Sequence, residues 1–158
     1  MSEPPWLNDG EQRAWRAFYA AGKVLFDQLD RELQRDANMP HAYYELLVVL
    51  SEVPGRELRM RELAELTRSS PSRLSHAIAR LEDRGWVRRR ECPDDKRGQF
   101  AALTGEGMAA LTAAASGHVQ GVRAHLFDRL TPEQVDQLRE ICEAVVRPLA
   151  PDHPVSRQ

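Results

Sequence analysis

Residues 60–104 read MRELAELTRSSPSRLSHAIARLEDRGWVRRRECPDDKRGQFAALT, and this stretch decides the fold of the whole chain. The spacing of its apolar residues predicts a short helix at about residues 60–67 and a longer helix that begins at Pro71. Two short runs typical of strands follow, at residues 86–90 and 99–103, and a charged turn joins them. The stretch therefore predicts a small unit of two helices and a hairpin.

The longer helix has two different sides. Ser70 fits the N-cap position and Pro71 the first helical position, so the start of the helix is well marked. An apolar side, formed by Leu74, Ile78 and Leu81, must be buried. The opposite side is small, polar and basic, and it carries Ser72, Arg73, Ser75, His76, Ala79, Arg80 and Asp83. Such a side either approaches DNA closely, with hydrogen bonds to bases and phosphates, or is an ordinary solvated helix face.

The hairpin favours the DNA interpretation. Gly85 is placed to end the preceding helix, and residues 93–98 have the composition of a turn. Basic side chains are concentrated on this small element, namely Arg88, Arg89, Arg90, Lys96 and Arg97. This is more positive charge than solubility requires, so we expect the hairpin to contact DNA. Because neighbouring strand residues point to opposite faces, at most two of residues 88–90 can face DNA together.

The segments RELAEL, SSPSRLSHAIARLEDRGWVRR and DDKRGQFAALTGEG together resemble the MarR family of bacterial transcription regulators. The most specific part is the hairpin signature Asp95-x-Arg97-Gly98, followed by Leu103-Thr104. The resemblance extends over nearly the whole chain, since the flanking helices also occur where that family has them. It implies a mainly α (α+β) fold, in which a winged helix-turn-helix lobe is joined to a helical dimerisation region from both chain ends.

Helices are also indicated outside the central stretch. Apolar residues recur at helical spacing at about residues 9–35, 41–52, 104–128 and 132–149. Asp9 with Gln12 forms a capping-box pattern at the first start, and Thr131 with Gln134 forms one at the last. Residues 57–59 predict a short strand that adds to the hairpin.

Two glycines in the helix at residues 104–128 leave an alternative open. Gly117 and Gly121 lie one helical turn apart, and each weakens the helix by about 1 kcal/mol relative to Ala. They either let another backbone come close or permit a bend.

The expected organisation is a single domain of residues 1–158. It consists of a DNA-binding lobe at residues 41–103 and of dimerisation helices at residues 9–37 and 104–150. These amphipathic helices from the two chain ends have little intrachain surface to cover them. The simplest partner is a second copy of the chain, so we expect a homodimer.

The charge distribution supports the assignment of the lobe. The net charge of −2 by itself argues against nucleic acid. Residues 56–100, however, contain 12 basic and 8 acidic residues, while the rest of the chain contains 10 basic and 16 acidic residues. Positive charge is therefore concentrated on the part of the chain that is expected to read DNA.

Other classes of protein find little support in the sequence. Its five histidines form no nucleophile or HExxH motif, and there is no glycine-rich phosphate loop, so we expect no enzyme. Cys92 and Cys142 form no disulfide framework or zinc spacing, and we expect no cofactor and no metal. His118 and His125 share a helix face but lie two turns apart, too far for one ion. The N-terminus lacks a signal-peptide pattern and no membrane span is visible, so we expect a cytoplasmic protein.

The function expected from these features is that of a homodimeric, sequence-specific DNA-binding transcription regulator, a repressor that a small effector releases. Two recognition helices would enter successive major grooves of an inverted-repeat operator, with half-sites about 10 bp apart. The expected DNA-binding residues are Ser70, Ser72, Arg73, Ser75, His76, Arg80, Arg88, Arg90, Asp95, Lys96 and Arg97. The alternative is a winged-helix module that binds protein without DNA. It would require apolar anchors on the recognition face, and that face has none.

The family resemblance adds two assignments. It places Arg97 in the minor groove of the operator. It also implies that a small aromatic or phenolic effector binds between the dimerisation helices and the winged lobe. The candidate effector-binding residues are Trp15, Phe18, Tyr19, His41 and Tyr44, for which plain packing in the core or the dimer interface is the alternative.

Overall fold

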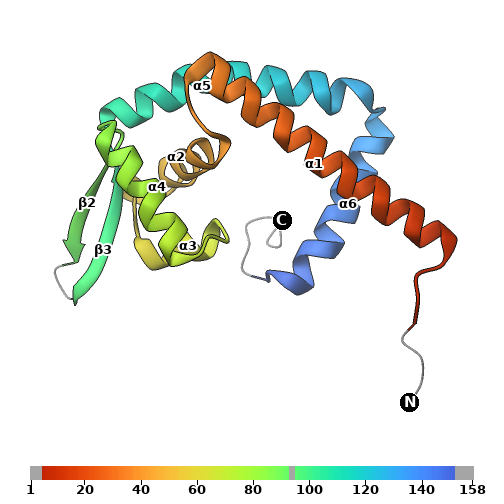
Figure 1. The fold of residues 1–158 in the computed structure, drawn as a ribbon, viewed down its shortest axis with the longest axis horizontal. Helices are drawn as coiled ribbons and strands as arrows, with labels where there is room; N and C mark the ends of the chain where they lie inside the picture. Colours follow the sequence, from red (N-terminus) through yellow and green to blue (C-terminus); the bar gives the residue numbers. More distant parts are fainter. Residues whose placement is uncertain (1–4, 93–94, 152–158) are drawn as a thin grey trace.

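A computed structural model describes residues 5–92 and 95–151, with the side chains of residues 92–97 outside the described part. The chain forms an arch, with a compact lobe at one end and a long helical arm at the other (Figure 1). The helices are α1 (Asp9–Ala37), α2 (His41–Glu52), α3 (Met60–Leu66), α4 (Pro71–Asp83), α5 (Gly105–His125) and α6 (Pro132–Leu149). Short 3-10 turns cover Pro54–Arg56 and Phe127–Arg129.

The strands are β1 (Glu57–Arg59), β2 (Val87–Cys92) and β3 (Asp95–Leu103). They form an antiparallel sheet in the order β1-β3-β2, so β3 is the central strand and the β2–β3 hairpin extends beyond the helices as a wing (Figure 1). The expected third strand at residues 57–59 is confirmed. The architecture confirms the mainly α fold with a winged helix-turn-helix lobe.

The lobe is held by a core that α2, α3, α4 and the sheet share. Leu47, Leu50, Leu63, Ile78 and Leu81 are each 0% exposed. The apolar side of α4 therefore faces this core, as its spacing predicted. Complete burial of a leucine or isoleucine side chain contributes about 1.5–3 kcal/mol, so this core fixes the position of α4.

Helix starts follow the capping chemistry in the sequence, with one correction. Ser70 accepts a hydrogen bond from the backbone N–H of Arg73, and Thr131 forms a full capping box with Gln134. The first helix is capped by Asn8 with Glu11 and not by Asp9, because the Asn8 side chain reaches the free N–H of Glu11. The predicted start was thus one residue late.

The helix α5 is shorter than predicted. It ends at His125, and a separate 3-10 turn follows at Phe127–Arg129. Gly121 is buried against α1, where an added Cβ would lie 2.6 Å from Glu32 Oε2 and 3.2 Å from the Leu29 side chain. A Cβ added at Gly117 would have no such neighbour within 4 Å. Close approach is therefore the role of Gly121, and it lets α5 cross α1.

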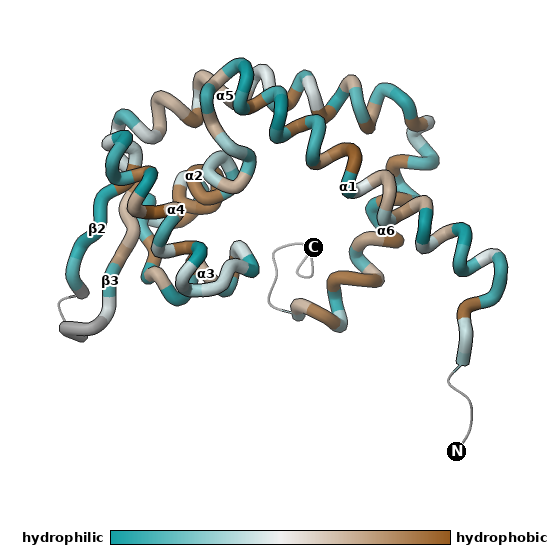
Figure 2. The backbone as a smooth tube through the Cα atoms, in the orientation of Figure 1, coloured by the Kyte–Doolittle hydropathy of each residue, from teal (hydrophilic) through white to brown (hydrophobic). Residues whose placement is uncertain are grey.

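The arm leaves much apolar surface uncovered. No residue of α6 is buried, although hydrophobic residues recur along it (Figure 2). Large exposed side chains on α1 and α6 include Trp15, Phe18, Tyr19, Val24, Phe26, Ile141, Val145 and Leu149. Within the described residues, no helix is long and apolar enough to cross a lipid bilayer.

Candidate nucleic-acid interface

The outer side of α4 is open to solvent along its length. Ser72, Arg73, Ser75, His76 and Arg80 are all exposed, and none of them contributes to the core. The fold thus places one continuous polar and basic side of α4 at the surface, opposite its three buried apolar residues. Ser72, Arg73 and His76 can thus reach base edges or phosphates. Arg80 lies 3.8 Å from Asp83, and the Ser75 hydroxyl oxygen accepts a hydrogen bond from Arg89 at 3.3 Å.

Ser70 has a structural task as well. Its hydroxyl oxygen accepts the backbone N–H of Arg73 at 3.3 Å, which satisfies one of the free donors in the first turn of α4. The hydroxyl proton is still available as a donor. Ser70 therefore fixes the start of the exposed face and remains a candidate for a phosphate contact.

The wing is braced against α4 through Arg89. Its Nη2 donates to the backbone oxygen of Ser75 at 2.7 Å, and its Nε lies 3.2 Å from Glu82 Oε2. The other oxygen of Glu82 accepts the backbone N–H of Arg89 at 2.9 Å. These groups are about two-thirds buried or more, so the pair is partly shielded from solvent. The pair therefore ties the direction of β2 to that of α4.

The neighbouring arginines of β2 differ in their surroundings. Arg90 is paired with Glu57 of β1 at 2.6 Å, and its guanidinium lies 5.2 Å from the centre of the Phe100 ring. Arg88 is exposed on the same face of the strand. Of the two predicted contacts at these positions, Arg88 is the freer, while Arg90 also links β2 to β1 across the sheet.

The tip of the wing carries the remaining predicted residues. The backbone of Asp95, Lys96 and Arg97 belongs to β3, and their side chains lie outside the described residues. The β2–β3 pairing is irregular between Glu91 and Cys92, close to the tip. The strand pairing therefore carries these three residues away from the body of the lobe, at the end of the hairpin.

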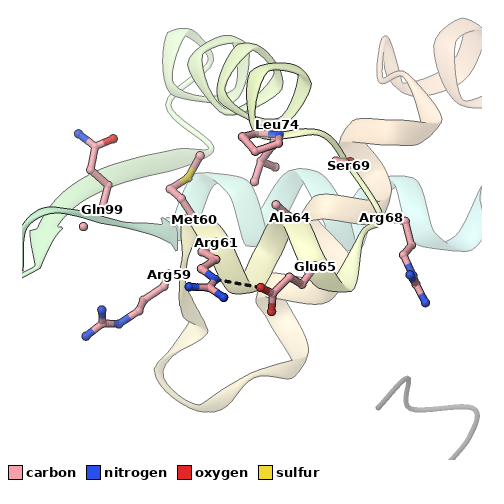
Figure 3. A pocket seen from close by; sticks show the side chains of 11 residues that line it. Arg59, Met60, Arg61, Ala64, Glu65, Arg68, Ser69, Leu74 and Gln99 are labelled. Carbon is pink, nitrogen blue, oxygen red and sulfur yellow. Dashed lines mark hydrogen bonds and ion pairs between the residues drawn. The ribbon is translucent and has the colours of Figure 1, made fainter. Parts of the chain in front are cut away.

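A hollow of about 840 Å³ lies beside the recognition helix, between β1, α3, the start of α4 and the wing (Figure 3). Met60, Ala64 and Leu74 line its apolar part. Arg59 and Arg61 lie at its rim, and Arg61 forms an ion pair of 3.0 Å with Glu65 (Figure 3). Arg68 also lines the hollow, so three arginines and one acidic residue, Glu65, surround it.

The predicted effector residues fall into two separate groups. Trp15 lies next to Phe18 and Tyr19 on the outer half of α1, with ring centres 6.4 and 6.1 Å away, and all three are more than half exposed. His41 and Tyr44 belong to the second group, where α1, α2 and α5 meet. Phe26 lies next to both groups, because it lines a hollow of about 320 Å³ together with Phe18 and Tyr19, and its ring centre lies 5.8 Å from that of His41.

The second group contains aromatic residues that the sequence did not single out as effector contacts. The His118 ring of α5 lies 4.4 Å from the Tyr44 ring and 5.5 Å from His41, and Phe26 lies 5.8 Å from His41. A cavity of about 60 Å³ adjoins His118. The sequence indicated the position of His118 only through its seven-residue spacing from His125, because this spacing places both histidines on the side of α5 that faces α1.

Ionisable groups at this crossing are perturbed by their neighbours. Burial lowers the pKa of His118, nearby His41 lowers it further, and Glu32 raises it. A hydrogen bond from Gln28 and another from His125, each 2.7 Å long, lower the pKa of Glu32. Burial raises the pKa of Tyr44. Among the described residues, no three His, Cys, Asp or Glu side chains converge where they could hold a metal ion.

Comparison with known proteins identifies the family. A family model described as MarR family matches residues 37–98. The transcriptional regulator HosA of Escherichia coli O111:H- is 35% identical over 93 residues, which are 58% of this chain and 67% of HosA. This chain belongs to the MarR family. Its members are transcription regulators that bind DNA and are not enzymes, which supports the interpretation that this chain is no enzyme.

Solved structures of MarR-family regulators from Streptomyces coelicolor extend the match to the whole chain. Sco3205, whose crystal structure is a complex with DNA, is 55% identical with a TM-score of 0.89 and covers 98% of each chain. AbsC is 40% identical with a TM-score of 0.85, over 92% of this chain and 98% of AbsC. The likeness therefore includes the arm helices as well as the winged lobe.

Proposed function

We propose that this MarR-family chain acts as a homodimeric repressor that reads an inverted-repeat operator and leaves it when a small effector binds. The observation that carries the proposal is the combination of an exposed basic face on α4 with an uncovered apolar face on α6. The first is suited to DNA and the second to another copy of the chain. The DNA complex of Sco3205 supports the first part, since that protein is 55% identical.

Dimerisation follows from the uncovered arm. Ile141, Val145 and Leu149 of α6 are 59%, 50% and 73% exposed, and Phe18 of α1 is 60% exposed. Contiguous apolar patches of this kind are rare on monomers and mark surfaces that meet a partner. A second copy is the partner we propose, because a twofold pair covers the same patch on both chains at once.

DNA reading follows from the symmetry of such a pair. Two α4 helices related by a twofold axis would enter successive major grooves, with half-sites about 10 bp apart. Arg73, His76 and Arg80 would then lie at the base edges and phosphates. We assign Arg88 and Arg97 to the wing contacts, with Arg97 in the minor groove, where a narrow A·T-rich stretch concentrates negative potential.

For the effector we favour the crossing of α1, α2 and α5 over the outer half of α1. His41, Tyr44, Phe26 and His118 offer ring faces and polar ring atoms in one place, which suits an aromatic or phenolic compound. Trp15, Phe18 and Tyr19 we assign to dimer packing. An effector at the crossing would act by favouring one spacing of the two recognition helices over another.

The test is selection of DNA from a random-sequence pool by the purified chain, followed by gel shifts at increasing salt. An enriched inverted repeat, bound more tightly than a scrambled duplex at every salt concentration, is the expected outcome. Enrichment of no sequence, with binding that disappears in parallel on both duplexes as salt rises, would leave only non-specific attraction to phosphates.

A further inference from the structure

The C-terminal end of α4 is one place where the lobe meets the helices α1 and α5. Gly85 follows α4 with a φ of 71°, which turns the chain towards β2. The backbone N–H of Trp86 then donates to the oxygen of Leu81 at 2.9 Å and closes the end of α4. The shared core holds α4 along its apolar side. The contacts of residues 84–86 add to it at the C-terminal end of the helix, and so help to set the orientation of α4 relative to α1 and α5.

The helix α5 contacts this end directly. The oxygen of Trp86 accepts the backbone N–H of Thr104 at 3.0 Å, and the Thr104 hydroxyl donates to the oxygen of Gly85 at 2.6 Å. Gly107 packs so closely on the Trp86 carbonyl that a Cβ there would overlap it. Through these contacts the start of α5 is fixed to the end of α4.

Arg84 contacts the end of α1, which is also held by the burial of Leu33 and Met39 in the core. The Nη1 of Arg84 donates to the backbone oxygen of Asn38 at 2.7 Å. Asn38 is the left-handed residue that ends α1, with a φ of 49° and a ψ of 39°. The Arg84 guanidinium also lies 4.8 Å from the Trp86 ring centre and 5.9 Å from that of Tyr43 in α2. Arg84 thus links the ends of α1 and α4 across 46 residues of sequence.

These contacts form a junction of Asn38, Tyr43, Arg84, Trp86 and Thr104. We propose that Arg84 is a positioning residue that sets the angle between the recognition helix and the arm, and so determines which half-site spacing the dimer accepts. A planar guanidinium suits this task, because it donates to a carbonyl at its edge while its faces contact aromatic rings. The inference rests on the proposed dimer on an inverted repeat.

Its test compares two DNA duplexes. The first is the duplex that the wild-type chain selects from a random pool, and the second has one base pair inserted at its centre, which rotates one half-site by about 35°. Affinities of the wild type, Arg84→Ala and Arg84→Lys are measured on both duplexes and on a scrambled duplex. The matched control is Arg35→Ala, which removes the same charge from the last turn of α1, where Arg35 pairs with its neighbour Asp36.

The wild type and Arg35→Ala should bind the selected duplex tightly and the lengthened duplex much more weakly. Arg84→Ala should bind the selected duplex about tenfold more weakly, within the range for residues that couple two parts of a protein. Its affinity for the lengthened duplex should be only slightly lower than that of the wild type. The ratio of its affinity for the selected duplex to its affinity for the lengthened duplex therefore falls. Arg84→Lys should lie between these values, because it keeps the charge but not the planar contact.

Two results would overturn the inference. If Arg84→Ala weakens binding to all three duplexes by one common factor, Arg84 is only a phosphate contact. If the affinities of Arg84→Ala for the selected and lengthened duplexes have the same ratio as those of the wild type, the junction does not set the half-site spacing. Arg84→Lys gives the same readout should the alanine variant fail to fold. A wild type that shows no preference between the duplexes would instead contradict the proposed dimer on an inverted repeat.

Discussion

Arg88, Arg89 and Arg90 are consecutive in the sequence, and each has a different environment. Arg89 braces β2 against α4 through Ser75 and Glu82, and Arg90 bridges to Glu57, while Arg88 is exposed. A run of arginines on a wing is therefore not simply a set of DNA contacts. The alternation of a strand divides it between the sheet face that meets α4 and the face that does not.

On the recognition helix, Arg73 and His76 are exposed and not engaged in the core. Arg73→Ala and His76→Ala should each weaken binding to the selected duplex by about 1–3 kcal/mol where a base contact is lost. Binding to scrambled DNA should change less, because it depends on phosphates. Gel shifts on both duplexes measure the difference, and equal losses on both would mean that the side chain reads no base.

At the crossing of α1, α2 and α5, His118 makes stability depend on pH. Its pKa is lowered in the folded chain, mainly by burial, so the unfolded chain binds the proton more readily. Its effect on stability is therefore absent above the ordinary value of 6.5, and the free energy of unfolding falls as pH decreases from there to the folded pKa. Below the folded pKa the loss becomes constant.

Replacing His118 by Asn should remove this part of the pH dependence. Urea unfolding of the wild type and of His118→Asn at pH values from 8 to 5 measures it, and the wild type should lose more stability on acidification. Since His41 and Glu32 also act on the pKa of His118, only the difference between the two proteins is informative. Parallel curves would show that His118 takes up a proton equally well in both states.

Among the elements, α4 and α6 show what the sequence can predict. The start of α4 at Ser70-Pro71 and that of α6 at Thr131 with Gln134 agreed with the structure, because a cap is a local interaction. The end of α5 and the Arg84 contact to Asn38 were not predicted. They depend on tertiary packing between segments far apart in the chain, and no periodicity in the sequence records that.

The helix α6 should be needed for dimerisation. Ile141→Asp or Val145→Asp would bury a carboxylate in the proposed interface, and we expect the dimer Kd to rise by about a hundredfold or more. Sedimentation velocity over a range of concentrations measures this change. Ala144→Asp, which adds the same charge beside the apolar stripe, is the control and should weaken the dimer much less.

Removal of the whole helix α6 tests its role in dimerisation more strongly than a point substitution. A chain that ends before Thr131 should lose dimerisation and tight DNA binding together. A truncated chain that sediments as a monomer and still binds the selected duplex tightly would contradict the role assigned to α6.

At the scale of the whole molecule, the arch separates two surfaces. The winged lobe lies at one end, and α6 with the N-terminal half of α1 lies at the other (Figure 1). The junction of Asn38, Tyr43, Arg84, Trp86 and Thr104 lies between them. A change in how two arms pack would therefore reach the recognition helices through that junction. The arrangement fits a regulator in which an effector at the α1–α2–α5 crossing alters the distance between two α4 helices.

The central claim is that two copies of this chain bind one operator. Light scattering of the chain with an excess of the selected duplex measures the protein mass in the complex most directly. We expect a protein mass of twice the 18.0 kDa of one chain per duplex, and the same protein mass in the absence of DNA. A complex that contains a single chain of 18.0 kDa, bound with full sequence specificity, would contradict the claim.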